Sequence, residues 1–229
     1  MKQRLELVRL TTLIESRPYM ANRHNHYEAA FEAYLRQERI AYVAVDEKRR
    51  TLVGEGSLKS LDFIVSPNSV ASPSSPATQA ATRWLVDVKG RKFPSGVKQP
   101  QYWRNWSTED DLRSLARWRQ EFGPGFDAAL VFAYQLTADR APTPPEQVFP
   151  YRDASYAFVG IGLDDYLAAM RPLSAKWKTV SMPVAEFRRR ARPLLEFLAP
   201  ATTDYWPRDN GDAWESPPCE TQPAFSTTP

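Results

Sequence analysis

Apolar residues recur along the chain at spacings that predict alternating helices and strands. One helix is predicted by apolar positions that recur at intervals of three and four, namely Tyr27, Ala30, Phe31, Tyr34 and Leu35. Asn25 stands where this helix needs an N-cap. Short apolar runs predict strands at 40–45, 60–65, 83–89, 128–134, 156–161 and 176–180.

Three further helices are predicted between and after these strands. Thr108 and Asp111 have the spacing of a capping box, which begins a helix that ends before the Gly123–Gly125 turn. Asp164 is expected to cap a short helix that reaches Met170, and a closing helix is expected over 183–198. The resulting order, α-β-β-β-α-β-β-α-β-α, predicts an α/β sandwich around a mixed sheet.

Low-complexity segments set the domain limits. Residues 67–82 are rich in Ser, Pro, Ala and Thr and predict a flexible insertion between two strands. Residues 201–229 predict a disordered, Pro-rich acidic tail, which leaves residues 1–200 as a single domain. From Pro200 onward the chain carries a formal charge of −4, so the whole-chain value of +3 conceals a body of +7. A basic body favours partners that are rich in phosphate.

Composition excludes several classes of protein. Cys219 is the only cysteine, so the chain forms no internal disulfide and no cysteine-based zinc site. Two histidines, His24 and His26, disfavour a His-triad metal centre. No apolar run approaches the roughly 18 residues that would span a bilayer. The first ten residues mix charges with apolar residues and lack a signal-peptide core, so we expect a cytoplasmic protein with no membrane partner.

Two predicted strands carry an acid among apolar residues. Asp62 shares a strand face with Ile64, and Asp87 shares one with Leu85 and Lys89. Burial of an isolated carboxylate costs several kcal/mol, so buried acids are normally paired or bound to a cation. Strands that are neighbours in the sequence could bring both acids to one ion. Oxygen ligands with room for water suit Mg²⁺ or Mn²⁺.

These residues form a pattern that resembles the PD-(D/E)xK nuclease superfamily, and in particular its Holliday-junction-resolvase-like members. The pattern consists of Glu28 on the first helix, Asp62 on one strand, and Asp87-Val88-Lys89 on the next strand. The predicted order from Asn25 to Tyr134 also matches the restriction-endonuclease-like α-β-β-β-α-β core, with a mixed central sheet flanked by helices. The sequence departs from the common motif at one position, where Leu61 stands in place of a proline.

The resemblance implies a role for each residue of the pattern. Asp62 and Asp87, with the carbonyl of Val88, would hold the divalent metal, Mg²⁺ or Mn²⁺. Lys89 would position or activate the attacking water and stabilise charge on the phosphate. Glu28 would correspond to the first-helix glutamate of many members.

Purely structural interpretations of these residues also exist. Asp87 and Lys89 could form a partly exposed ion pair at the end of a strand. Asp62 could cap a turn or lie on the wet face of an edge strand. Glu28, three residues after Asn25, could complete a helix cap.

Basic and aromatic residues follow directly after Lys89. Between Arg83 and Arg119 the chain has a local charge of +5, and cations of this kind bind phosphates without regard to base sequence. Candidate nucleic-acid contacts in this stretch are Arg91, Lys92, Lys98, Gln101, Trp103 and Arg104. The aromatic residues of this stretch can equally be interpreted as packing residues, since large aromatic side chains are often buried. A second basic cluster, Arg188–Arg190 with Arg192, is interpreted as the solvated face of a helix.

The sequence therefore predicts a divalent-metal-dependent endonuclease that hydrolyses phosphodiester bonds in DNA, with RNA not excluded. The alternative is an inactive nuclease-like fold that binds nucleic acid or serves as a scaffold. Homodimers are frequent among similar nucleases, so a homodimer is compatible with the sequence without being specified by it.

Overall fold

The computed structural model describes residues 25–45, 51–53, 56–67 and 82–199. The predicted insertion at 67–82 falls almost wholly outside the described residues, and the predicted tail at 201–229 lies entirely outside them. Within the described part, the main sheet has the strand order β1-β4-β5-β7-β9-β12, with β8 paired to β9. Its strands are β1 (Ala41–Ala44), β4 (Phe63–Ser66), β5 (Arg83–Phe93), β7 (Phe126–Leu136), β8 (Phe149–Tyr151), β9 (Ala154–Gly162) and β12 (Arg192–Pro193).

The sheet is mixed, as the sequence predicts. Strands β5 and β7 run parallel over their full lengths, whereas β4 pairs with β5 and β9 pairs with β7 in the antiparallel sense. The connection between the two parallel strands contains helix α3 (Glu109–Phe122), as a parallel crossover requires. The predicted α-β-β-β-α-β core is confirmed: it consists of α2 (His26–Gln37), β1, β4, β5, α3 and β7.

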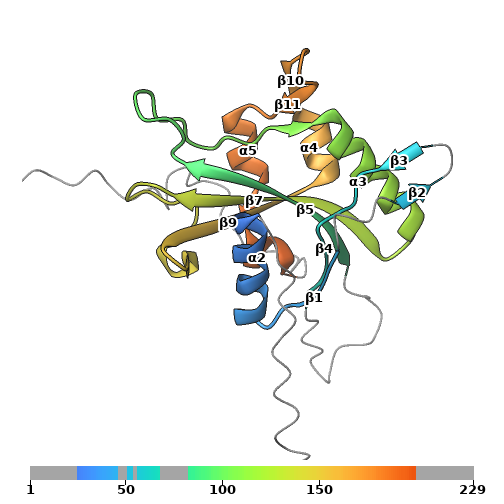
Figure 1. Cartoon of the computed structure of the whole chain (residues 1–229), viewed down its shortest axis with the longest axis horizontal. Coiled ribbons are helices and arrows are strands. Elements are labelled where there is room, and N and C mark those ends of the chain that lie inside the picture. Colours follow the sequence, from blue (N-terminus) through green and yellow to red (C-terminus); the bar gives the residue numbers. More distant parts are fainter. Residues whose placement is uncertain (1–24, 46–50, 54–55, 68–81, 200–229) are drawn as a thin grey trace, which may run out of the picture.

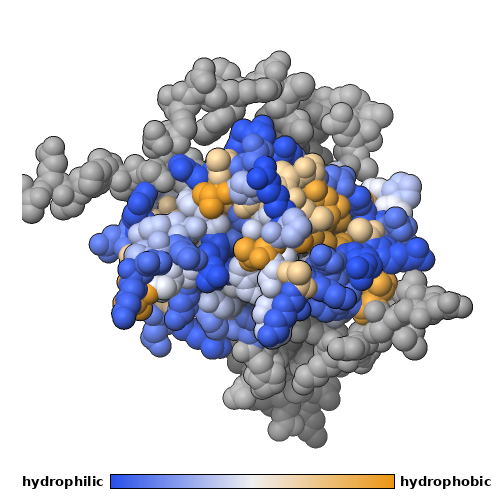
Figure 2. Space-filling view, turned by 90° about the horizontal axis from the view of Figure 1, so that it is seen from above, coloured by the Kyte–Doolittle hydropathy of each residue, from blue (hydrophilic) through white to orange (hydrophobic). Residues whose placement is uncertain are grey.

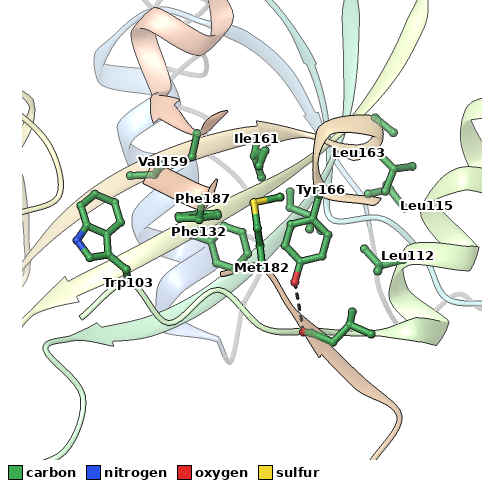
Figure 3. Close-up of a cluster of buried hydrophobic side chains, with 14 of the residues drawn as sticks. Trp103, Leu112, Leu115, Phe132, Val159, Ile161, Leu163, Tyr166, Met182 and Phe187 are labelled. Carbon is green, nitrogen blue, oxygen red and sulfur yellow. Dashed lines mark hydrogen bonds between the residues drawn. The ribbon is translucent and has the colours of Figure 1, made fainter. Parts of the chain in front are cut away.

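Helices cover both faces of this sheet (Figure 1). On one face, α2 and α6 (Leu194–Leu198) bury Phe31, Tyr34 and Leu194 against the strands. On the other face lie α3, α4 (Leu163–Ala169) and α5 (Val184–Arg190). Figure 3 shows the second core layer, which holds residues of all three of these helices and of β7 and β9, among them Leu112, Leu115, Phe132, Ile161, Tyr166 and Phe187. The site described below lies at the margin of this layer.

The two long helices begin at the predicted caps. The side chain of Asn25 accepts a hydrogen bond from the Tyr27 backbone N–H at 3.1 Å and so caps α2. Thr108 and Asp111 form the reciprocal hydrogen bonds of a capping box at the start of α3. Helix α3 ends at Gly123, whose φ of 72° is readily adopted by glycine.

The predicted closing helix over 183–198 is wrong. The chain forms α5, then the short strand β12, and then α6. Pro193 has no backbone N–H and disfavours helical geometry at Arg192, so the helix cannot continue through this pair. The predicted cap at Asp164 is also wrong, because Gly162 is the N-cap of α4. Asp164 instead accepts a hydrogen bond from Arg119 at 2.8 Å.

Several short strands are not predicted from the sequence. Strands β2 (Thr51–Val53) and β3 (Gly56–Leu58) form a hairpin before β4. A small separate sheet joins β10 (Arg171–Ser174), β11 (Thr179–Ser181) and β6 (Ser107–Thr108). The strand expected at 176–180 therefore starts three residues later than predicted. Among the described residues, no helix is long and apolar enough to cross a membrane.

Candidate active site

A pocket of about 360 Å³ lies beside β5, where the start of α2 and the first turns of α3 approach the sheet. Pairing between β4 and β5 ends at Phe63 and Val86, so the next residues of β5 have no partner on β4. The two helices reach this uncovered flank of β5 from opposite faces of the sheet. The pocket is lined by Asn25, Glu28, Lys59, Ser60, Leu61, Asp62, Asp87, Val88, Lys89, Asp111, Ser114, Leu115 and Trp118.

Asp62 lies directly before β4 and is fixed against β5 by two hydrogen bonds. Its backbone N–H donates to the Val86 carbonyl at 3.0 Å, and its carboxylate accepts from the Val88 N–H at 2.6 Å. The Asp62 carboxylate thus accepts the hydrogen bond that a backbone carbonyl would accept if β4 were longer and continued to pair with β5. Asp62 is only 5% exposed, so this contact also satisfies part of a buried charge.

Asp87 and Lys89 lie two residues apart on β5 and point to the same side. The Lys89 Nζ is 2.8 Å from an Asp87 carboxylate oxygen. Burial raises the pKa of Asp87, and the positive charge of Lys89 opposes that rise. Asp62 lines the same pocket and has a smaller effect in the same direction as Lys89, lowering the pKa of Asp87. Strand β5 and the residue before β4 therefore bring two carboxylates and one ammonium group into one pocket.

Asp111 and Lys59 extend this arrangement beyond the residues that the sequence pattern singles out. The Asp111 carboxylate lies 2.8 Å from the Lys89 Nζ and 2.8 Å from the Lys59 Nζ. Burial alone would raise the pKa of Asp111, but Lys89 and the hydrogen bond from Lys59 hold it well below its ordinary range. Burial likewise works against the charge of Lys89, but Asp87 and Asp111 outweigh it and raise the pKa. Lys89 is therefore a cation at neutral pH.

The sequence contained a signal for Asp111 but none for Lys59. Asp111 has the spacing of a capping-box residue, which explains its hydrogen bond to the Thr108 N–H at 3.2 Å but not its contact with Lys89. Lys59 follows β3, a strand that was not predicted, and it is placed by tertiary contacts. Trp118 on α3 donates a hydrogen bond to the Lys59 carbonyl at 2.8 Å.

Glu28 reaches the pocket from α2, on the far side from Asp111. It is 5% exposed and accepts a hydrogen bond from the side-chain amide of Asn25. The start of α2 lies very close to β5, because Gly90 has no side chain there. A Cβ at Gly90 would lie 2.1 Å from the ring of Tyr27. Glu28 follows Tyr27 directly on α2, so this close approach also brings Glu28 near the strand that carries Asp87.

The chemistry of the pocket fits a hard divalent cation. Among the described residues that line it, four carboxylates face two lysines, a formal excess of two negative charges. The possible metal ligands near Val88 are oxygen atoms of Asp62, Asp87 and the backbone. Oxygen atoms are the type of ligand that Mg²⁺ and Mn²⁺ bind. In the described part of the chain, no group of three or more His, Cys, Asp or Glu side chains is arranged to hold a metal ion. A cation here would therefore rest on two carboxylates, with water or backbone oxygens as further ligands.

The candidate nucleic-acid contacts fall into two groups. Four of them are exposed on the end of β5 and the segment that follows it, namely Lys92, Lys98, Gln101 and Arg104. Arg91 is half-buried; its guanidinium lies 3.8 Å from the centroid of the Trp106 ring and donates to the carbonyls of Gly90 and Trp106. Trp103 is 7% exposed and lies in the core beside Phe187. It is therefore a packing residue, which is the alternative role given to it above.

The comparisons with known proteins do not assign this chain to a family. No protein-family model matches the sequence, and no curated protein matches it. Among solved structures, it is similar to Hjc, a Holliday junction resolvase from the archaeal hyperthermophile Archaeoglobus fulgidus. The two chains share 13% sequence identity and a TM-score of 0.42, over 76% of this chain and 98% of the resolvase. This similarity is remote, so the function proposed below rests on the pocket itself.

Proposed function

We propose that the protein is a divalent-metal-dependent nuclease of the PD-(D/E)xK type, which hydrolyses phosphodiester bonds in DNA. One observation carries the proposal: Asp62, directly before β4, converges on one pocket with Asp87 and Lys89 on the adjacent strand β5 of a mixed α/β fold. Phosphodiester hydrolysis needs this combination, because a phosphate must be neutralised and a water molecule must be activated beside it.

The oxygen donors of the pocket have a direct role in this proposal. Asp62, Asp87 and the Val88 carbonyl would hold the metal ion. When bound, the ion would neutralise phosphate charge and lower the pKa of the attacking water. Glu28 supplies a further carboxylate from the opposite wall, where Asn25 orients it.

Lys89 acts in this proposal as a cation and not as a base. Asp87 and Asp111 raise its pKa and so favour the ammonium form, which has no lone pair with which to accept a proton. It can donate hydrogen bonds to the attacking water and to a phosphate oxygen, and its charge opposes the negative charge that develops there. Asp87 and Asp111 hold the ammonium group in place through contacts of 2.8 Å each.

The experiment that tests this function is a cleavage assay with a panel of nucleic acids. Wild type is incubated with linear, nicked, single-stranded and branched DNA, and with RNA, in Mg²⁺ or Mn²⁺. We expect cleavage of at least one DNA and complete inhibition by a chelator. Asp87→Ala and Lys89→Ala should each lower the rate by about 10²- to 10³-fold.

Asp153→Ala is the matched control, because Asp153 is exposed between β8 and β9 and does not line the pocket. It should cleave as wild type does. The enzymatic function is wrong if wild type cleaves no nucleic acid, or if the Asp87 and Lys89 variants cleave the same nucleic acids as wild type does. The nuclease-like fold would then serve as a nucleic-acid-binding or scaffolding module.

A further inference from the structure

The hairpin of β10 and β11 displays large apolar side chains on the molecular surface. Trp177, at its turn, is 69% exposed, and Leu173 on β10 is 55% exposed. Figure 1 shows the hairpin projecting from the end of the molecule above α4 and the start of α3. Figure 2 looks onto this side, where the surface is mostly hydrophilic with separate hydrophobic patches. With 69% of its surface exposed, Trp177 contributes little to the core, and its ring is accessible to a partner.

Local contacts hold Trp177 at the turn. Its backbone N–H donates to the Ser174 hydroxyl at 3.4 Å, and the N–H of Lys178 donates to the Ala175 carbonyl at 3.3 Å. The ammonium group of Lys176 lies 5.3 Å from the centroid of the Trp177 ring. Lys178 has a φ of 46°, a left-handed conformation that closes the turn. The indole is therefore presented by an ordered turn.

The charge of the hairpin is entirely positive. Between Arg171 and Ser181 the chain has three cations, Arg171, Lys176 and Lys178, and no acid. Two of them flank Trp177 directly. Cations beside an exposed aromatic ring are the combination that binds single-stranded nucleic acid, where phosphates meet the cations and bases stack on the ring. An acidic partner with flat aromatic groups is thus complementary to this surface.

Backbone hydrogen bonds connect the hairpin to the pocket. Strand β11 pairs with β6, the strand that ends at the Thr108 cap of α3. The Lys178 carbonyl accepts a hydrogen bond at 2.9 Å from the N–H of Glu109, the first residue of α3. Asp111, which holds Lys89 in the pocket, follows two residues later. A nucleic acid bound at Trp177 would therefore lie next to the helix start that carries one wall of the pocket.

We propose that Trp177 is a stacking platform for an unpaired base, and that Lys176 and Lys178 bind the phosphates beside that base. The proposal rests on the proposed function in taking DNA as the partner, and it specifies the substrate class: DNA in which unpaired nucleotides adjoin a duplex. Single-stranded flaps, gaps and branch points have this property, whereas a fully paired linear duplex does not.

Binding measured without cleavage tests this proposal independently of catalysis. The full chain is titrated into a labelled duplex with a single-stranded flap and into a labelled, fully paired duplex. A chelator is present to prevent cleavage, and binding is measured by fluorescence anisotropy. Trp177→Ala should weaken flap binding by about 5- to 100-fold and leave duplex binding unchanged. Trp177→Phe, which keeps an aromatic face, should retain most of the flap affinity.

Two further variants separate charge from stacking. Lys176→Ala and Lys178→Asn should weaken binding to both DNAs and reduce its dependence on salt, because they remove phosphate contacts. Asparagine is chosen at 178 because it tolerates the left-handed backbone. Val97→Ala, at an apolar residue that is 97% exposed and lies outside the hairpin, should bind both DNAs as wild type does.

The proposal is overturned if Trp177→Ala binds the flap as tightly as wild type, or if it loses affinity for both DNAs equally. It is also overturned if wild type binds neither DNA, whether or not it binds vesicles of anionic lipid. Flap binding that depends on Trp177, in a protein that cleaves no DNA, would support the stacking platform while contradicting the nuclease function. The two proposals can therefore fail separately.

Discussion

Lys89 is held between two carboxylates, and these contacts explain why it stays charged although its side chain is only 15% exposed. Asp87 is one partner and lies on the same strand, whereas Asp111 comes from the first turn of α3. A carboxylate with two cationic neighbours is itself stabilised in its ionised form. Asp111 therefore stabilises the fold as well as orienting Lys89.

Asp111→Asn should lower the free energy of unfolding by about 1 to 3 kcal/mol at neutral pH, because charged hydrogen bonds to Lys59 and Lys89 are lost. The pKa of Asp111 is lowered in the folded state, so this stabilisation is complete above the unfolded pKa of about 4 and is lost as the pH falls below it. The gap between wild type and variant should therefore narrow below about pH 4 in urea unfolding.

Asp110→Asn is the control for this change, since Asp110 is the preceding residue of α3 and its side chain is 56% exposed. Its contact with the Lys59 Nζ is 3.5 Å long, and exposed pairs of this kind contribute at most about 1 kcal/mol. If both variants lose the same free energy of unfolding at neutral pH, the buried contacts of Asp111 contribute no more to stability than the exposed contact of Asp110.

Gly90 controls how closely α2 approaches β5. Gly90→Ala would bring a methyl group against the Tyr27 ring, and overpacking of this kind costs about 1 to 3 kcal/mol. Gly162→Ala is the comparison, because a Cβ there meets only an Asp165 oxygen at 3.9 Å and should change stability by less than about 1 kcal/mol. Urea unfolding of both variants measures the difference, and similar stabilities would contradict a tight contact at Gly90.

At the level of single residues, the sequence identified acids that interrupt apolar strands. Asp62 and Asp87 were conspicuous because a carboxylate in a buried strand needs a partner, and Lys89 was in phase with Asp87. Lys59 could not be found in this way. Its position depends on a hairpin and a helix that meet only in the folded chain, and no local pattern records that contact.

Among the elements, α3 depends most on its cap, because its first turn carries Asp111. Thr108→Ala removes the hydroxyl that accepts from the Asp111 N–H at 3.1 Å. The expected loss in stability is about 0.5 to 2 kcal/mol, and Thr108→Ser should recover most of it. Urea unfolding distinguishes the two variants; a serine variant as unstable as the alanine variant would show that the hydroxyl is not the cause.

Caps and proline positions explain which elements were predictable. Helices α2 and α3 combine an N-cap residue with a clear apolar period, and both were placed correctly. The closing helix was extended through Pro193, although the proline itself marks the interruption. Strands β6 and β10 contain no apolar run that would indicate a strand, so only β11 of the small sheet was anticipated, by the strand expected at 176–180.

Across the whole molecule, the positive charge predicted from the sequence lies partly on the exposed surface at the end of β5 and in the segment that follows it. Lys92→Ala and Arg104→Ala should each weaken DNA binding and lower the slope of log affinity against log salt by about 1. Arg117→Ala is the control, because this exposed arginine pairs with Glu121 on α3 at 2.6 Å. Anisotropy titrations over a range of salt concentrations measure the slopes; unchanged slopes in Lys92→Ala and Arg104→Ala would place the DNA elsewhere.

The proposed nuclease function requires a divalent cation at Asp62 and Asp87, and calorimetric titration of Mn²⁺ measures that requirement directly. Wild type should bind one Mn²⁺ per chain in the pocket, and Asp153→Asn should bind it equally well. The double variant Asp62→Asn/Asp87→Asn, if folded by circular dichroism, should bind none. Wild type that binds no Mn²⁺, or a folded double variant that binds it as wild type does, would contradict a metal-dependent active site at this pocket.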